Sequence, residues 1–162
     1  SVGQIPLFYN HKNTGRPLPQ GAWFQKFRSN YLDVDNEPLY PFGYGLSYTT
    51  FSYSDITLDK SSMNINGEIM ATVTVTNTGK YDGSEVVQLY IRDLIGSVTR
   101  PVKELKHFEK QLIKAGETKT FRFDIDLERD FGFVNEDGKR FLEAGEYHIL
   151  VQGQTVKIEL ID

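Results

Sequence analysis

Alternation of apolar and polar side chains dominates the sequence from about residue 50 onward. Residues 69–76 place Ile69, Ala71, Val73 and Val75 on one face and three threonines on the other, as expected for a half-buried strand. The same period of two recurs in residues 118–126, 147–151 and 156–160. The side chains predicted to point inward are Ile69, Ala71, Val73, Val75, Phe121, Phe123, Ile125, Tyr147, Ile149, Val151, Val156, Ile158 and Leu160. This pattern predicts an antiparallel β structure with one apolar interior.

Three further stretches complete the predicted set of strands. Residues 85–91 are apolar on both faces, which indicates a central strand. Residues 51–58 are a further strand candidate, and residues 105–113 are a less regular one. About seven short strands at turn-punctuated intervals are typical of the immunoglobulin and fibronectin type III sandwiches. We therefore predict an all-β antiparallel sandwich over residues 50–162, with a single helical turn at 126–131.

The first 49 residues show no such alternation. Residues 4–9 are one candidate strand, and Trp23, Phe27 and Tyr31 have the spacing of a short amphipathic helix. Prolines and glycines interrupt the rest of this stretch. One strand and a long irregular segment cannot bury a core of their own. We interpret residues 1–49 as the end of another domain plus a linker, so that the chain is expected to be a fragment.

Residues 40–51, YPFGYGLSYTTF, join these two parts and are rich in aromatic rings and glycine. If the segment is extended, its large side chains lie on one side and its small ones on the other. The large ones are Phe42, Tyr44, Leu46 and Tyr48. Such a ribbon suits either a stacking platform for a sugar or a packed seam. Because it lies between two parts that each need a surface to pack on, we favour the seam.

Composition and charge exclude several classes of partner. A hydrophobic share of 39% with 25% charged residues supports an ordinary soluble core. The net charge of −4 makes nucleic acid and anionic membrane surfaces poor partners. The sequence has no apolar run long enough for a transmembrane helix, and it lacks cysteine, which excludes disulfides and thiolate chemistry.

Residues suited to metal binding do not form a recognisable motif. His11, His107 and His148 lie far apart without the spacing of a zinc site. Residues 33–44 begin like a calcium loop but have proline where its glycine is required, and tyrosine in place of the final glutamate. A second acidic cluster consists of Asp124, Asp126, Glu128 and Asp130. This cluster has two possible explanations, a surface calcium ion or a solvated strand end, and we favour the solvated strand end. We predict no metal and no cofactor.

Residue types and spacings do not nominate a catalytic centre either. Two basic stretches are candidates for binding instead. Residues 10–17 form a polar loop in which Arg16 is suited to a sugar hydroxyl or a carboxylate. The alternative, which we favour, is a turn whose arginine pairs with a neighbouring domain. The charges of residues 100–106 are most simply explained as keeping a sheet edge soluble.

An ordered series of motifs runs through the chain at residues 3–17, 39–51, 75–79, 88–91, 100–109 and 115–117. The series resembles the bacterial family 3 glycoside hydrolases, and their periplasmic β-glucosidases in particular. Residues 3–17 are similar to the end of the α/β domain in that family, and residues 39–51 to the segment that precedes its fibronectin type III-like domain. Motifs similar to those of that domain follow at residues 75–79, 88–91, 100–109 and 115–117. The resemblance spans essentially the whole chain.

The resemblance implies a parent enzyme that hydrolyses β-D-glucosides by a retaining, two-carboxylate mechanism. In the family, the nucleophilic aspartate belongs to a barrel domain and the acid/base glutamate to the α/β domain, and neither matches a residue of this chain. The implied partners are those two domains, and the implied location is the periplasm or the exterior of a bacterium. The residues expected to contact substrate or a neighbouring domain are Arg16, Trp23 and Tyr44.

A second hypothesis is an independent carbohydrate-binding or adhesion module. It requires an exposed line of rings, and we expect Tyr44, Tyr48, Tyr81 and Tyr90 to provide it if it exists. The only tryptophan lies outside the predicted sandwich. We therefore favour a fragment with a structural role that braces the catalytic domains.

Overall fold

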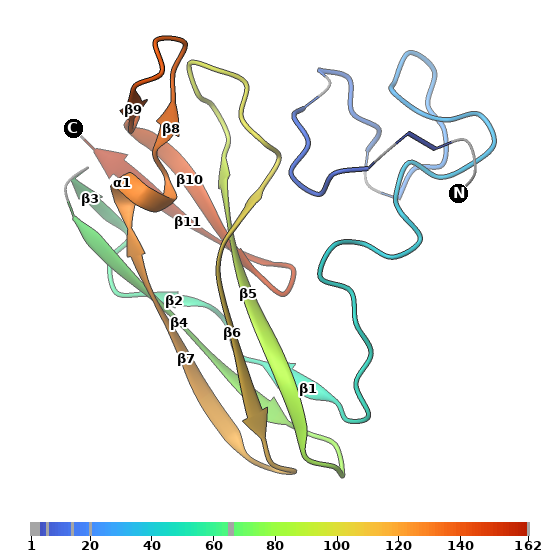
Figure 1. The fold of residues 1–162 in the computed structure, drawn as a ribbon, viewed down its shortest axis with the longest axis vertical. Helices are drawn as coiled ribbons and strands as arrows, with labels where there is room; N and C mark the ends of the chain where they lie inside the picture. The colour runs from blue at the N-terminus through green and yellow to red at the C-terminus, as the bar shows by residue number, and fades with distance from the viewer. Residues whose placement is uncertain (1–3, 6, 14, 20, 65–66, 162) are drawn as a thin grey trace.

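A computed structural model confirms the all-β sandwich (Figure 1). It describes residues 4–5, 7–13, 15–19, 21–64 and 67–161. Two sheets face each other, and their inner faces contribute the hydrophobic core. Alternation of apolar residues in the sequence produces this arrangement because successive side chains of a strand point to opposite faces.

The first sheet is built around β4 (Glu68–Asn77). On one side β4 pairs along its length with β7 (Thr118–Asp126). On the other side it pairs with β1 (Phe51–Tyr53) and then β2 (Thr57–Leu58). The inward residues predicted on β4 and β7 are all buried.

The second sheet has five strands in the order β3-β11-β10-β5-β6. They are β3 (Ser62–Asn64), β11 (Gln154–Ile161), β10 (Gly145–Val151), β5 (Gly83–Asp93) and β6 (Glu104–Ile113). All pairs are antiparallel except that of β3 with β11. The predicted strand at 85–91 is β5, an inner strand as expected, whereas β6 forms one edge of the sheet.

The connection between β7 and β10 lies at one end of the sandwich. It contains the helical turn α1 (Leu127–Asp130) and a two-stranded hairpin of β8 (Phe133–Val134) and β9 (Arg140–Phe141). The side chain of Asp126 caps α1 by accepting from the Arg129 amide. The predicted helical turn is therefore present.

The predicted strand at 51–58 is wrong as a single element, because it divides into β1 and β2. Tyr53 pairs with Val75 and Thr57 with Thr72, so three residues between the pairs on this strand oppose two on β4. The extra residue is a bulge, which turns Ile56 into the core. Alternation alone does not reveal such an insertion.

The N-terminal segment, by which we mean the described residues up to position 50, contains no helix or strand element (Figure 1). The predicted helix around Trp23 is absent, and Phe27 has a positive φ of 64°. A helix this short is stable only when its apolar face packs against another surface. The rings of Trp23 and Phe27 are exposed here, so that packing is missing. The predicted strand at 4–9 is also wrong for its described residues; Pro6 lies outside them.

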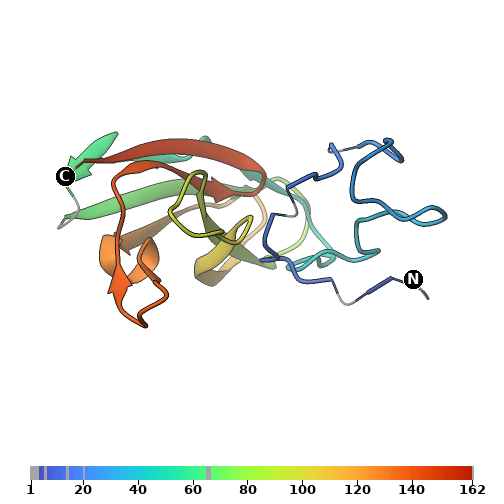
Figure 2. The ribbon, with the colours of Figure 1, turned by 90° about the horizontal axis from the view of Figure 1, so that it is seen from above.

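The N-terminal segment lies to one side of the sandwich, beside β5 and β6 (Figures 1 and 2). It then runs along the molecule to the start of β1 at the opposite end from the β8–β9 hairpin (Figure 1). No helix in the described part of the chain is long and apolar enough to cross a membrane.

Candidate functional site

The junction between the N-terminal segment and the sandwich is held first by backbone hydrogen bonds. The amide of Val102 donates to the carbonyl of His11 over 2.9 Å, and Lys12 forms an isolated antiparallel bridge with Pro101. The amide of Leu105, at the start of β6, donates to the hydroxyl of Tyr9 at 3.3 Å. Two polar stretches that looked unrelated in the sequence, residues 10–17 and 100–106, therefore meet here.

Aromatic stacking forms the second part of the junction. The ring of Tyr9 lies on that of Phe42 with centroids 4.1 Å apart and meets Tyr90 of β5 edge-on at 6.0 Å. A turn closed by the Tyr44 amide and the Pro41 carbonyl presents Phe42 to this stack. Tyr90 is left only 9% exposed. Part of the YPFGYGLSYTTF ribbon is thus packed against the sandwich.

Glycine is required at one point of this turn. Gly43 has a φ of 80°, and a Cβ built on it would come within 2.4 Å of the Gln88 side chain on β5. Gly45, two residues later, has no such neighbour within 4 Å. The backbone of the ribbon therefore comes close to β5 at Gly43 and not at Gly45.

Asn77, at the end of β4, anchors the far end of the N-terminal segment. It is completely buried, and its Oδ1 accepts from the hydroxyl of Thr49 at 2.6 Å and from the amide of Gly79 at 3.1 Å. Its Nδ2 donates to the carbonyls of Tyr81 and Ile113. One amide side chain thus joins the linker, the β4–β5 turn and the end of β6.

The N-terminal segment also has a strongly apolar exposed surface. It supplies thirteen of the 22 large hydrophobic side chains that are exposed in the described part of the chain. They are Ile5, Leu7, Phe8, Trp23, Phe24, Phe27, Leu32, Leu39, Tyr40, Phe42, Tyr44, Leu46 and Tyr48. So dense a group of exposed apolar side chains is characteristic of an interaction surface.

The three residues predicted to contact substrate or a neighbouring domain lie apart from one another. Arg16 lines an open pocket with Lys26 and Arg28 and has an exposed side chain. Trp23 is 55% exposed, and Tyr44 is 54% exposed with a tilted contact to Tyr40. Among the described residues, no hydrogen bond, ion pair or ring contact joins any two of the three.

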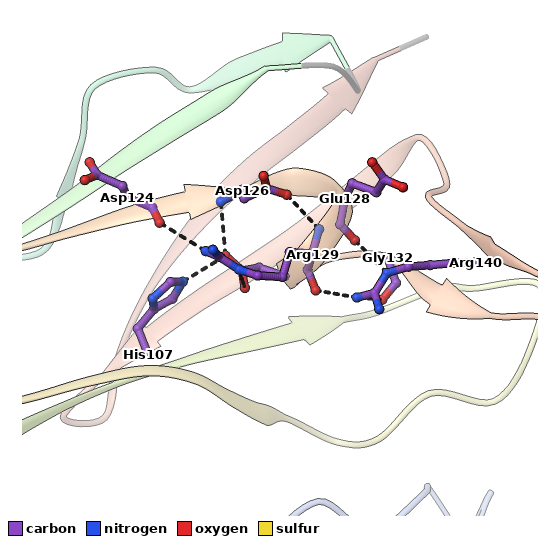
Figure 3. Close-up of polar contacts among 8 residues, drawn as sticks. His107, Asp124, Asp126, Glu128, Arg129, Gly132 and Arg140 are labelled. Carbon is purple, nitrogen blue, oxygen red and sulfur yellow. Dashed lines mark hydrogen bonds and ion pairs between the residues drawn. The ribbon is translucent and has the colours of Figure 1, made fainter.

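A buried charge network ties the two sheets together beside α1 (Figure 3). Asp130 accepts from His107 of β6 at 2.8 Å, from the amide of Asp126 at 3.0 Å and from the Arg129 guanidinium at 2.8 Å. Burial works to raise the pKa of Asp130, but the hydrogen bonds from Arg129 and His107 outweigh it and hold that pKa below its usual range.

The same network answers the question raised by the acidic cluster. Asp126 caps α1 and Asp130 is paired with cations, while Arg140 donates to the carbonyls of Glu128 and Arg129 (Figure 3). No group of three or more His, Asp or Glu side chains in the described ranges is arranged to hold a metal ion. The arrangement is that of a strand end fixed by hydrogen bonds.

Sequence reasoning missed two parts of this site. The partnership of His107 with Asp130 was not expected, because 23 residues and a change of sheet separate them. The anchoring role of Asn77 was also missed. Its position directly after an alternating strand, followed by Thr78 and Gly79, was the available signal.

In a comparison with known protein families, the fibronectin type III-like domain matches residues 85–155 of this chain. The chain is 48% identical over 160 residues to a periplasmic beta-glucosidase of Salmonella typhimurium, covering 98% of this chain and 20% of that protein. It is 41% identical over 150 residues to a beta-xylosidase of Formosa agariphila, covering 93% of this chain and 20% of that protein. The chain thus spans about a fifth of the length of these relatives.

A solved structure agrees with these matches. The crystal structure of a beta-glucosidase from Listeria innocua in complex with gluconolactone superimposes with a TM-score of 0.93 at 38% identity. The match covers 99% of this chain and 23% of the Listeria chain. The similarity therefore includes the N-terminal segment as well as the sandwich.

Proposed function

Because the chain belongs to the β-glucosidases of glycoside hydrolase family 3, as the C-terminal region that contains their fibronectin type III-like domain, we propose that it braces the catalytic domains of such an enzyme. The parent enzyme hydrolyses terminal β-D-glucosides with retention of configuration. Its nucleophile and its acid/base carboxylate belong to the preceding barrel and α/β domains. The chain itself contributes no catalytic residue.

The observation that carries this proposal is that the N-terminal segment is both docked and strongly apolar. It is fixed to the sandwich by Tyr9, Phe42 and the backbone bond of Val102. It nevertheless leaves most of its large apolar side chains exposed. Burying that surface against the preceding domain would rigidly connect the domain to the sandwich. We therefore assign residues 1–49 to the end of the α/β domain and its linker, and residues 50–162 to the fibronectin type III-like domain.

Arg16, Trp23 and Tyr44 fit this proposal as contacts to the preceding domain. All three are exposed residues of the N-terminal segment. Arg16 and Arg28 are long cations without an acidic partner among the described residues, and such cations commonly pair across interfaces. The name of the Salmonella relative supports a periplasmic location.

A carbohydrate-binding module remains the second candidate, since Tyr44, Tyr48 and Tyr81 are all exposed. The fourth ring of the expected strip, Tyr90, is buried beneath Tyr9. A stacking platform needs a continuous line of accessible rings. The burial of Tyr90 therefore favours the bracing role.

Two measurements on the purified chain test the proposal. We expect no hydrolysis of an aryl β-glucoside and no saturable response to cello- or laminari-oligosaccharides at millimolar concentrations. Hydrolysis by the chain alone would overturn the assignment of catalysis to other domains. Saturable oligosaccharide binding at millimolar concentration or tighter would replace the purely structural role with the binding-module hypothesis.

A further inference from the structure

A basic pocket of about 430 Å³ lies where three distant segments meet at the end of the sandwich that carries the β8–β9 hairpin. The N-terminal segment contributes Lys12, and the β5–β6 connection contributes residues 98–101. The start of β6 and residues 132–140 complete the lining. The side chains that carry charge or a hydroxyl are those of Lys12, Thr99, Arg100, Glu104, Lys106 and Arg140.

The charge of this pocket is opposite to that of the chain. Among the described residues that line it, four are cationic and Glu104 is the only carboxylate, although the chain carries a net charge of −4. Asp93, behind the pocket, lies 3.5 Å from Arg100. Even when Asp93 is counted, cations outnumber carboxylates by four to two. A concentration of positive charge in a concave site attracts anions.

Two of these cations are largely withdrawn from water. The side chain of Arg100 is 11% exposed and that of Lys106 is 16% exposed. Both approach the same oxygen, Oε2 of Glu104, at 3.7 and 3.6 Å. Arg100 has a second carboxylate neighbour in Asp93, whereas Lys106 has, in the part of the chain that the structure describes, only the Glu104 carboxylate that it shares with Arg100. A cation as buried as Lys106 is therefore only partly compensated at this distance. Lys12, which completes the group, has no acidic partner among the described residues.

The pocket is also held in place from behind. The Arg100 guanidinium lies 4.1 Å from the centre of the Phe133 ring and donates to the Phe131 carbonyl at 3.3 Å. The amide of Ser97 donates to Glu143 at 3.0 Å, which ties the β5–β6 connection to the segment before β10. These contacts position Arg100 and the β5–β6 connection without adding a carboxylate to the pocket lining.

We propose that this pocket binds a small oxyanion, a carboxylate or phosphate group, between Lys12, Arg100 and Lys106. Glu104 acts as an internal competitor, because its carboxylate already lies between two of the cations. The site is independent of the bracing role, since it does not involve the exposed apolar side chains of the N-terminal segment. Inorganic phosphate and glucuronate, the carboxylate of an acidic sugar, present the same chemistry from two sources.

Backbone amide NMR on the 162-residue chain tests the site directly. Phosphate and glucuronate are titrated separately at constant ionic strength, with glucose as the uncharged control. We expect saturable shifts at Thr99, Arg100 and Gly132 with a Kd on the order of 1 mM for at least one anion, and none with glucose. The anion that saturates at the lower concentration identifies the preferred group.

Two substitutions in the pocket are predicted to act in opposite directions. Lys106→Gln removes a cation and should weaken binding about fivefold, whereas Glu104→Gln removes the competitor and should tighten it by a similar factor. Lys114→Gln, at the β6–β7 turn on the opposite end of the sandwich, is the matched control and should change nothing. Amide shifts outside the pocket verify that each variant is folded.

Three results would overturn the proposal. The first is a linear response to both anions, equal to that of chloride. The second is unchanged binding in Lys106→Gln, and the third is weaker binding in Glu104→Gln. Because glucoside hydrolysis and apolar contacts have no part in this measurement, its failure leaves the bracing role unaffected.

Discussion

Asp130 illustrates how single side chains connect the two sheets. Its carboxylate is 4% exposed and accepts from His107 on β6 and from Arg129 on α1. Burying a carboxylate is unfavourable unless such partners compensate. The sequence indicated an acidic cluster here but not its partners, because hydrogen bonds between sheets depend on the packed fold and leave no local pattern.

Asp130→Asn should lower the free energy of unfolding at pH 7 by about 3 kcal/mol. The pKa of Asp130 is lowered in the folded protein, so its contribution is present above the unfolded-state pKa of about 3.9 and disappears as the pH falls through the folded-state value. Urea unfolding should therefore show a full difference at pH 7 that shrinks below about pH 4. Asp124→Asn, an exposed carboxylate on the same strand end, is the control. If Asp130→Asn lowered the free energy of unfolding by the same amount at every pH, this account would be contradicted.

Asn77→Ala should destabilise the chain by about 3 kcal/mol. The substitution leaves the carbonyls of Tyr81 and Ile113 and the amide of Gly79 without their partner. Thermal or urea unfolding measures the loss. Asn64→Ala, at an exposed position of β3, should change stability by less than about 0.5 kcal/mol. Equal effects of the two substitutions would show that the buried amide is not an anchor.

At the scale of elements, period-two alternation predicted the long strands because it reports which face is buried. β7 begins and ends at the predicted residues, and β4 lies within one residue of its prediction at each end. Shorter elements were less predictable. The bulge that divides residues 51–58 depends on the register with β4, and the helix around Trp23 lacks a packing surface in this chain.

The turn at residues 41–44 offers a matched test of a single element. Gly43→Ala introduces a Cβ at a φ of 80° and against Gln88, so it should strain the turn by about 1 kcal/mol or more and loosen the Tyr9–Phe42 stack. Gly45→Ala meets no neighbour and should be nearly neutral. Amide exchange of Leu105 reports on the docking of Tyr9. Equal exchange in both variants would contradict the close approach of Gly43 to β5.

At the scale of the whole molecule, the chain combines a well-packed sandwich with a segment whose apolar surface faces outward. Such a segment is expected to self-associate or to be cut first when it is separated from its proposed neighbour. The candidate site could be predicted only in part. The motifs indicated a junction between domains, but which residues form it depends on contacts between residues 9–12 and 100–105, which are about 90 residues apart.

Limited proteolysis should cut the chain between residues 10 and 37 before it cuts the sandwich. Tyr9→Ala should accelerate this cleavage several-fold, because it removes the stack on Phe42 and the bond to Leu105. Tyr48→Ala, at a ring that is 98% exposed, should leave the rate unchanged. Mass spectrometry of the first fragments identifies the sites. If cleavage inside β4 or β7 were as fast as cleavage between residues 10 and 37, the N-terminal segment would not be less stable than the sandwich.

The most direct test of the bracing role uses the complete enzyme. Removing residues 50–162 from it exposes the surface on which the sandwich lies, so the temperature of half-inactivation on an aryl β-glucoside should fall by many degrees. The remaining enzyme should keep its catalytic carboxylates and retain the configuration of the product. An unchanged inactivation temperature, with unchanged kcat/KM, would contradict the proposal that this region braces the catalytic domains.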